Sequence, residues 1–274
     1  MAYQINYAYT CHTGRVRSNN EDNFWCCGKS LEMNHLGTDG ILTGEVSVLE
    51  LPLFAVFDGM GGECCGETAS WLAAEACRFC AAEYGEEFKK QPQKFMLHLC
   101  REMNHKVCEY RQKNMIDSMG TTAALLTFGK NSVYACNLGD SRIYRWNQEE
   151  MEQISTDHVF LRGASRKGAL VQFVGIPETY MLLDPCPVQR EIEDGEKYLL
   201  CSDGLTDMLS DSEIQEILSR KISVKEQVEE LLRYSLERGG RDNVTMILCE
   251  VKKQKQQSSF WGWLKYIREE RNRR

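Results

Sequence analysis

The sequence of 274 residues lacks any unbroken apolar run approaching the length of about 18 residues that a membrane-spanning helix needs. Residues 1 to 7 have neither a basic start nor an apolar stretch of signal-peptide length. We therefore expect a cytoplasmic protein. No internal repeat is evident, and a chain that is 42% hydrophobic can bury one large core without needing a second domain.

Zinc-type cysteine spacing is also missing, because the 13 cysteines form no repeated CxxC pattern. Their number is odd, and they are scattered through apolar segments, with adjacent pairs at positions 26 and 27 and at positions 64 and 65. This distribution is typical of buried, reduced thiols and argues against a disulfide framework. We expect free cysteines.

An excess of positive charge is absent, since the net charge is −7. Proteins that hold nucleic acid through its phosphates are basic, so this charge argues against a nucleic-acid partner. Residues 252 to 274 are the exception: they carry eight Lys/Arg and two Glu, a net charge of +6, which leaves −13 for residues 1 to 251. We expect a folded, cation-binding domain over residues 1–251 and a separate basic tail over residues 252–274.

What the sequence does contain is an aspartate at one end of each of three apolar segments. Asp58 follows Phe54-Ala-Val-Phe, Asp203 follows Leu199-Leu-Cys-Ser, and Asp242 precedes Asn-Val-Thr245. Each aspartate stands where an expected strand meets a glycine-containing turn. Carboxylates are the ligands that Mg²⁺ and Mn²⁺ prefer, so three of them could converge on a hard divalent cation. The pattern predicts a metal-dependent hydrolase.

Helices are predicted in pairs. Apolar residues recur at helical spacing over residues 67 to 82 and 93 to 110, and Pro92 stands near the first turn of the second stretch. Two later helices are indicated by the capping boxes Ser210-Asp-Ser-Glu213 and Ser223-Val-Lys-Glu226, and the last helix is expected to end at Gly239-Gly240.

Short apolar runs over residues 121 to 128, 132 to 138 and 143 to 146 predict strands. They are separated by Gly129-Lys-Asn131 and by Gly139-Asp140, a pattern of antiparallel hairpins. Because strands and helices do not alternate strictly, the pattern favours antiparallel sheet covered by helices.

The tail has a pattern of its own. After a linker over residues 252 to 259, Phe260, Trp263, Leu264 and Ile267 fall on one helical face, and basic residues occupy the rest of the wheel. Such a basic amphipathic helix could lie on an anionic membrane or dock on an acidic partner, including the acidic body of its own chain. The alternative is that its aromatic residues simply cover the folded domain.

Seven short motifs occur in a fixed order along the chain: Arg17-Ser-Asn-Asn-Glu21-Asp22, Asp58-Gly-Met-Gly-Gly62, Met119-Gly-Thr-Thr122, Gly139-Asp-Ser-Arg142, Ser155-Thr-Asp-His158, Ser202-Asp-Gly-Leu-Thr-Asp207 and Gly239-Gly-Arg-Asp-Asn-Val-Thr245. In this order they resemble the metal-dependent protein phosphatases of the 2C type, in their bacterial form. The resemblance spans residues 14 to 251 and does not reach the tail. It implies an α+β fold, a four-layer αββα sandwich in which two antiparallel sheets pack face to face with helix pairs outside.

The resemblance also implies a two-metal site at one end of the sandwich, with two Mn²⁺ or Mg²⁺ ions as cofactors. Asp58 would bridge both ions, the backbone carbonyl of Gly59 would bind one of them, and Asp203 and Asp242 would bind the other. Asp117 corresponds to a position that helps to hold a third, weaker ion in bacterial members.

Arg17 is the expected phosphate ligand, because a forked guanidinium suits bidentate capture of phosphate oxygens. It stands four residues before Glu21, so in an extended chain the two side chains would point the same way. Glu21 and Asp22 are expected to orient waters around the ions. The more conservative interpretation assigns structural roles to Asp140 as a hairpin cap, to Arg142 and to His158.

Met60 departs from the animal members, which carry a proton-donating histidine directly after the Asp-Gly. Methionine donates no proton, so the leaving group must be protonated by a metal-bound water or by His158, or need no proton at all. We favour the water.

The implied activity is hydrolysis of phosphoserine and phosphothreonine monoesters on proteins by a water activated between two metal ions, countering a Ser/Thr protein kinase. We expect a monomer. The alternatives are a catalytically silent, phosphatase-shaped binding module and a metal-dependent phosphodiesterase or nuclease. The presence of Arg17, Asp58, Asp203 and Asp242 favours the enzyme, because a binding module has no need of mutually repelling charges. The acidic body counts against a nuclease.

Overall fold

A computed structural model describes residues 3–61, 65–160 and 168–254. The predicted amphipathic stripe of the tail, beginning at Phe260, lies outside these ranges, as does Cys64. Within the described ranges no helix has the length and apolar character to cross a membrane. Every cysteine in these ranges is free, as predicted.

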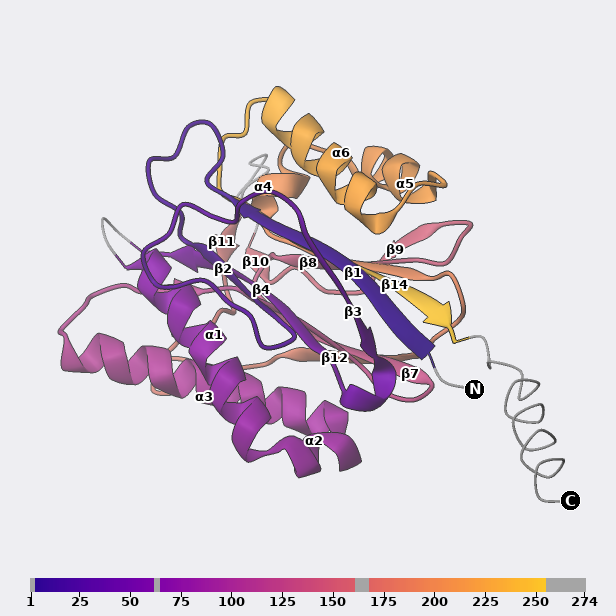
Figure 1. The fold of residues 1–274 in the computed structure, drawn as a ribbon. Helices are drawn as coiled ribbons and strands as arrows, with labels where there is room; N and C mark the ends of the chain where they lie inside the picture. The colour runs from indigo at the N-terminus through magenta and orange to yellow at the C-terminus, as the bar shows by residue number, and fades with distance from the viewer. Residues whose placement is uncertain (1–2, 62–64, 161–167, 255–274) are drawn as a thin grey trace, which may run out of the picture.

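Two large antiparallel sheets form the centre of the molecule (Figure 1). The first sheet has the strand order β3-β1-β14-β13-β8-β9 and consists of β1 (Tyr3–His12), β3 (Leu42–Ser47), β8 (Arg142–Trp146), β9 (Met151–Gln153), β13 (Lys197–Cys201) and β14 (Val244–Lys253). The second has the order β12-β7-β6-β4-β2, with β5 paired to β4, and consists of β2 (Asp22–Cys26), β4 (Leu53–Met60), β5 (Gly120–Thr121), β6 (Ala123–Phe128), β7 (Ser132–Leu138) and β12 (Cys186–Glu191). A short ribbon pairs β10 (Val159–Phe160) with β11 (Ala169–Leu170).

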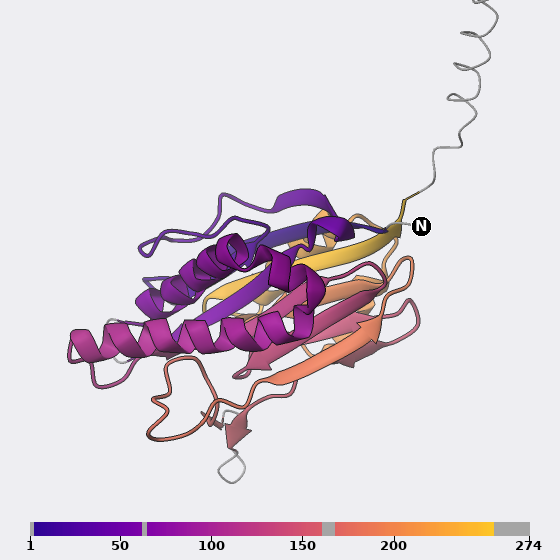
Figure 2. The same cartoon turned by 90° about the horizontal axis from the view of Figure 1, so that it is seen from below.

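Helices cover the outer face of each sheet. Figure 2 shows the helices α1 (Gly66–Glu83), α2 (Gly85–Lys90) and α3 (Pro92–Lys113) over the second sheet. The first sheet carries α4 (Asp203–Thr206), α5 (Asp211–Ser219) and α6 (Val224–Glu237), and a 3₁₀ turn, η1 (Val48–Glu50), follows β3. The layers therefore run helix, sheet, sheet, helix, and the predicted four-layer αββα sandwich is confirmed.

Three apolar clusters hold these layers together. One packs α1 and α3 on the second sheet, one fills the space between the sheets, and one packs α5 and α6 on the first sheet. Strand β14 contributes to two of them: Ile247 and Cys249 face the other sheet, whereas Met246 and Leu248 face the helices. Successive side chains of a strand point to opposite faces, so a strand covered on both faces is apolar throughout.

The local sequence signals for helices are confirmed. Helix α3 begins at Pro92, and α5 and α6 both carry the predicted capping boxes. Beyond the end of α6, Gly239 adopts a φ of 130°, a conformation that favours glycine. The short α2 was not predicted.

One of the two predicted hairpins is confirmed and the other is wrong. Strands β6 and β7 form the predicted hairpin, with Phe128 opposite Val133. The predicted hairpin between β7 and β8 is wrong, because these strands belong to different sheets. The chain crosses between the sheets at Gly139, whose φ of 99° permits the turn, and the hydroxyls of Thr122 and Ser141 lie 2.6 Å apart at the crossing.

Candidate active site

Strand pairing places two carboxylates side by side at one end of the sandwich. Asp22, the first residue of β2, stands opposite Asp58 near the end of β4. Asp22 is buried, and its Oδ2 accepts a hydrogen bond from Ser202 Oγ at 2.8 Å. Ser202 precedes Asp203, the first residue of α4. One strand register and one hydrogen bond therefore bring three aspartates from distant parts of the sequence together.

Asn243 joins the start of β14 to the loop between β1 and β2. Its side-chain carbonyl accepts the backbone N–H of Glu21 at 2.8 Å, and its amide donates to the carbonyls of Thr13 and Asn19, each at 2.9 Å. These contacts tie residues 13–21, which contain Arg17, to the turn that contains Asp242.

Arg17 lies in this loop and not in an extended strand, because residues 14–16 form a turn. The strand geometry by which we predicted a common direction for Arg17 and Glu21 is therefore wrong. Arg17 Nη2 donates to Asp242 Oδ2 at 2.8 Å, and 48% of the arginine side chain is exposed. This hydrogen bond is the largest cause of a raised Arg17 pKa, to which the negative charges of Glu21 and Asp58 also contribute. The loop thus still directs the guanidinium toward the carboxylates.

Burial and mutual repulsion dominate the electrostatics of the site. Burial raises the pKa of Asp58 well above its ordinary value, and the negative charges of Asp22, Asp203, Asp140 and Asp242 raise it further. We call these five residues the acidic cluster. Four of them are half-buried, and Asp22 is fully buried.

The pKa of Asp22 is raised to about 7, chiefly because the carboxylate is buried, and the hydrogen bond from Ser202 offsets this only in part. Carboxylates that are close together and poorly hydrated repel one another, and a bound divalent cation would offset this repulsion. Among the described residues, no three carboxylate, thiol or imidazole groups form a ready-made cage for one ion. Mg²⁺ and similar ions keep several waters and bind through one or two carboxylates, so the acidic cluster fits them without such a cage.

Gly59 is required by the packing around the cluster. Its N–H donates to the carbonyl of Glu21 at 3.1 Å. A Cβ at this position would lie 2.2 Å from the carbonyl oxygen of Gly66 and 2.3 Å from that of Glu21. Only glycine therefore allows the backbone after Asp58 to pass between the Arg17 loop and the start of α1.

Glu21 lies beside the cluster, where Asn19 Nδ2 donates to its Oε1 at 3.1 Å. Burial raises its pKa, and the neighbouring charge of Glu67 raises it further. Glu67 was not singled out by the sequence analysis.

Asp117 is not among the aspartates whose charges chiefly raise the pKa of Asp58. It is exposed in the connection between α3 and β5, and it lines a cavity of about 730 Å³ with Arg111, Glu178 and their neighbours. Its assignment to a third, weaker ion stays a prediction.

Asp140 was given a structural role as a hairpin cap by the sequence analysis. The hairpin is wrong, because β7 and β8 lie in different sheets, and the charge of Asp140 contributes to the raised pKa of Asp58. The signal was present, because Asp140 follows an apolar strand and a glycine, the same pattern that singled out the other aspartates.

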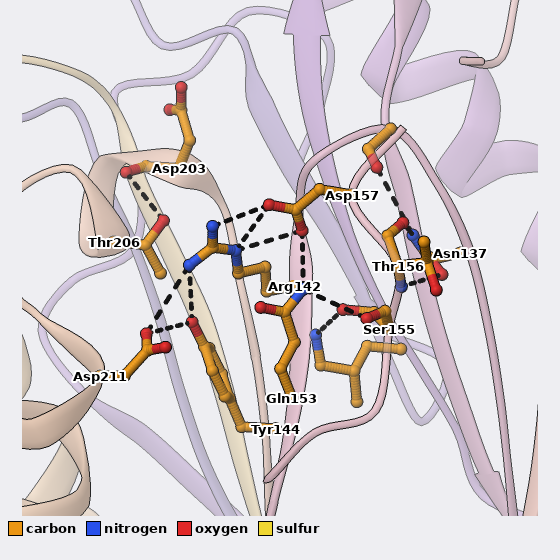
Figure 3. A network of polar contacts seen from close by, with 12 residues as sticks. Asn137, Arg142, Tyr144, Gln153, Ser155, Thr156, Asp157, Asp203, Thr206 and Asp211 are labelled. Atoms are coloured by element: carbon orange, nitrogen blue, oxygen red, sulfur yellow. Dashed lines mark hydrogen bonds and ion pairs between the residues drawn. The ribbon is translucent and has the colours of Figure 1, made fainter. Parts of the chain in front are cut away.

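Arg142 and His158 serve as scaffolding beside the cluster. Figure 3 shows Arg142 donating to Asp157 at 2.7 Å and to the Tyr144 hydroxyl at 3.0 Å. His158 Nδ1 accepts the N–H of Gly139 at 3.1 Å, and its Nε2 lies 3.3 Å from Cys186 Sγ. Burial lowers the His158 pKa. With both ring nitrogens engaged, this histidine is a poor source of a proton for a leaving group.

Comparisons with known proteins agree with this geometry. A family model described as protein phosphatase 2C matches residues 44–249. The serine/threonine phosphatase stp of Listeria innocua is 28% identical over 254 residues, covering 86% of this chain and 92% of that protein. The crystal structure of the Mycobacterium tuberculosis serine/threonine phosphatase PstP/Ppp has a TM-score of 0.74 at 27% identity, covering 91% of this chain and 100% of that one. The catalytic domain of PstP in complex with two manganese ions has a TM-score of 0.71 at 28% identity, covering 92% and 100%.

Proposed function

Since the chain belongs to the protein phosphatase 2C family, we propose that it is a metal-dependent protein serine/threonine phosphatase whose reaction takes place at the acidic cluster. The observation that carries this proposal is the meeting of Asp22 and Asp58 across β2 and β4, with Ser202, next to Asp203, bonded to Asp22. The raised pKa of Asp58 agrees with it. Such a cluster is costly to keep unless it binds cations. Its relatives are named serine/threonine phosphatases, and one of their structures is described as containing two manganese ions.

Asp58 would lie between two Mn²⁺ or Mg²⁺ ions, with the Gly59 carbonyl, Asp203 and Asp242 completing the protein ligands. When bound, two such ions offset the repulsion among the carboxylates, lower the pKa of a water and balance the negative charge of a phosphoryl transition state. A weaker third ion would be held with the help of Asp117, as the sequence predicts.

Arg17 would hold the phosphate of the substrate. Its Nη2 is anchored by Asp242, which leaves the other guanidinium N–H groups for phosphate oxygens. Glu21 and the buried Asp22 would orient the waters that complete the coordination of the ions. Phosphoserine and phosphothreonine proteins are the proposed substrates, and the enzyme would counter a Ser/Thr protein kinase in the cytoplasm as a monomer.

The test is hydrolysis of p-nitrophenyl phosphate and of a phosphothreonine peptide with and without Mn²⁺. We expect chelator to abolish both activities and Asp203→Ala to lower kcat/KM at least about 100-fold. The matched control is Asp39→Ala, which removes an exposed aspartate from the loop between β2 and β3. Hydrolysis that persists without metal, or equally in Asp203→Ala, would overturn the proposal.

A further inference from the structure

A second cavity, of about 330 Å³, lies beside the acidic cluster. Three parts of the chain line it: residues 18–20, directly after Arg17; residues 33–36, in the connection between β2 and β3; and Glu67, in the first turn of α1. The proposed function uses none of the side chains that line this cavity.

One of the lining residues carries a buried polar atom without a partner. Oε2 of Glu67 makes no hydrogen bond within the described part of the chain. Buried polar atoms are nearly always hydrogen-bonded, and an exception calls for an explanation. A ligand that donates hydrogen bonds at this wall is one such explanation.

The charge of the wall is negative. The Glu21 carboxyl lies against Gly66, so close that a Cβ on Gly66 would be 2.8 Å from its Cδ and Oε2, and Glu67 is the next residue. Burial lowers the pKa of His35, which therefore adds no positive charge at neutral pH. Glu67 is thus the carboxylate that lines the cavity, with the Glu21 carboxyl against the preceding residue, and the neutral imidazole of His35 lines it as well.

The rest of the wall is suited to an alkyl chain. Met33 and Leu36 line the cavity, and Met33 Sδ accepts a hydrogen bond from Thr68 at 3.4 Å, which holds the thioether in place. Lysine and arginine combine an apolar stem with a cationic head, and both parts find a complement here.

We propose that this cavity binds the basic side chain of an arginine or lysine that lies close in sequence to the phosphorylated residue of the substrate protein. The inference rests on the proposed function, because Arg17 would place the phosphate. Residues 18–20 continue directly from Arg17 into the wall, and an extended peptide advances about 3.3 Å per residue. We therefore expect the basic residue to lie a few positions from the phosphorylated one.

The experiment uses full-length protein with Mn²⁺ and phosphothreonine peptides in which one arginine is moved through four positions on either side. Each peptide has a twin with citrulline, which has nearly the same shape without the charge. We expect arginine at one position to raise kcat/KM about tenfold over its twin. Glu67→Gln should remove this preference and leave hydrolysis of p-nitrophenyl phosphate unchanged. Glu75→Gln, a half-buried carboxylate further along α1, is the matched control and should keep it.

A second variant is needed because Glu67 lies at the N-terminus of a helix, where Glu67→Gln could lower the stability of the fold. His35→Leu keeps the negative charge and removes the polar imidazole, and we expect it to raise KM for the preferred peptide with kcat unchanged. Thermal melting reports the fold of both variants. Equal turnover of all peptides, or a preference that survives in Glu67→Gln, overturns this assignment alone. Absence of any Mn²⁺-dependent hydrolysis by the wild type overturns the proposed function and this inference with it.

Discussion

Asp22 illustrates how one buried carboxylate couples stability to pH and to metal. Its folded-state pKa of about 7 exceeds the ordinary value of 3.8. As pH falls, the folded protein therefore takes up this proton before the unfolded chain does, and folding becomes more favourable. The direction is opposite to that of a carboxylate stabilised by an ion pair.

We predict that the free energy of unfolding of the metal-free wild type rises relative to that of Asp22→Asn as the pH is lowered from about 8 to about 5.5. Urea unfolding of both proteins at several pH values in the presence of chelator measures this difference. The opposing effect of His35 and His158, whose pKa values are lowered, is common to both proteins. Saturating Mn²⁺ should suppress the difference because the ions stabilise the ionised cluster. A difference that stays constant over this range would show that the ionised form of Asp22 is not penalised.

At position 59 the structure requires a residue without a side chain. A methyl group would collide with two backbone carbonyls, which cannot move as a flexible side chain can. We predict that Gly59→Ala lowers the free energy of unfolding by about 3 kcal/mol or more and abolishes Mn²⁺ binding. Gly85→Ala is the control, because nothing lies within 4 Å of a Cβ built there. Normal metal binding by Gly59→Ala would indicate that the chain bends at this point without loss.

At the scale of elements, the loop between β1 and β2 carries Arg17, the residue proposed to bind phosphate, but has no regular structure of its own. Its position depends on hydrogen bonds from Asn243, which lies 230 residues from Thr13. A polar anchor of this kind stabilises a loop in one conformation, because each broken bond would leave a buried group unpaired.

We predict that Asn243→Ala destabilises the fold by about 2 kcal/mol and lowers kcat/KM for phosphopeptides at least about tenfold. Its effect should be non-additive with that of Arg17→Ala in a double-mutant cycle, because both act through the same guanidinium. The control is Asn147→Ala, which removes an asparagine whose side chain accepts two backbone hydrogen bonds in the turn between β8 and β9. Full additivity would mean that Asn243 does not position Arg17.

At the scale of the whole molecule, the site and the start of the tail lie at opposite ends of one strand. Register pairs His12 with Val244, two residues after Asp242, whereas Tyr3 pairs with Lys253. Strand β14 has 10 residues and therefore separates the two by about 30 Å. The last strand includes residues 252 and 253, so the tail can be removed after residue 254 without shortening the sheet.

We predict that the full chain, but not a truncation to residues 1–254, sediments with anionic vesicles, because the basic residues and the aromatic stripe of residues 255–274 would act together at a lipid surface. Hydrolysis of p-nitrophenyl phosphate should be the same in both forms, since the tail starts far from the site. Neutral vesicles and high salt serve as controls. Equal sedimentation of the two forms would favour a tail that covers its own domain.

The sequence by itself determined the features that depend on near neighbours. Helical and strand periodicity, the capping boxes, Pro92 at the start of α3 and the glycines after α6 all act within a few residues, and the structure confirms them. Aspartates at strand ends were recognisable for the same reason. The order of the motifs also identified the four-layer sandwich, because a shared order of motifs reflects a shared topology.

Only the tertiary structure decided which of these groups meet. It placed Asp140 where its charge acts on Asp58, and it sent β7 and β8 into different sheets. It also showed that Arg17 lies in a loop with a turn, bonded to Asn243 through Thr13 and Asn19, and not in an extended strand. The physical reason is that the direction of a side chain follows local backbone geometry, whereas its electrostatic environment is set by burial and by charges brought close by long-range packing.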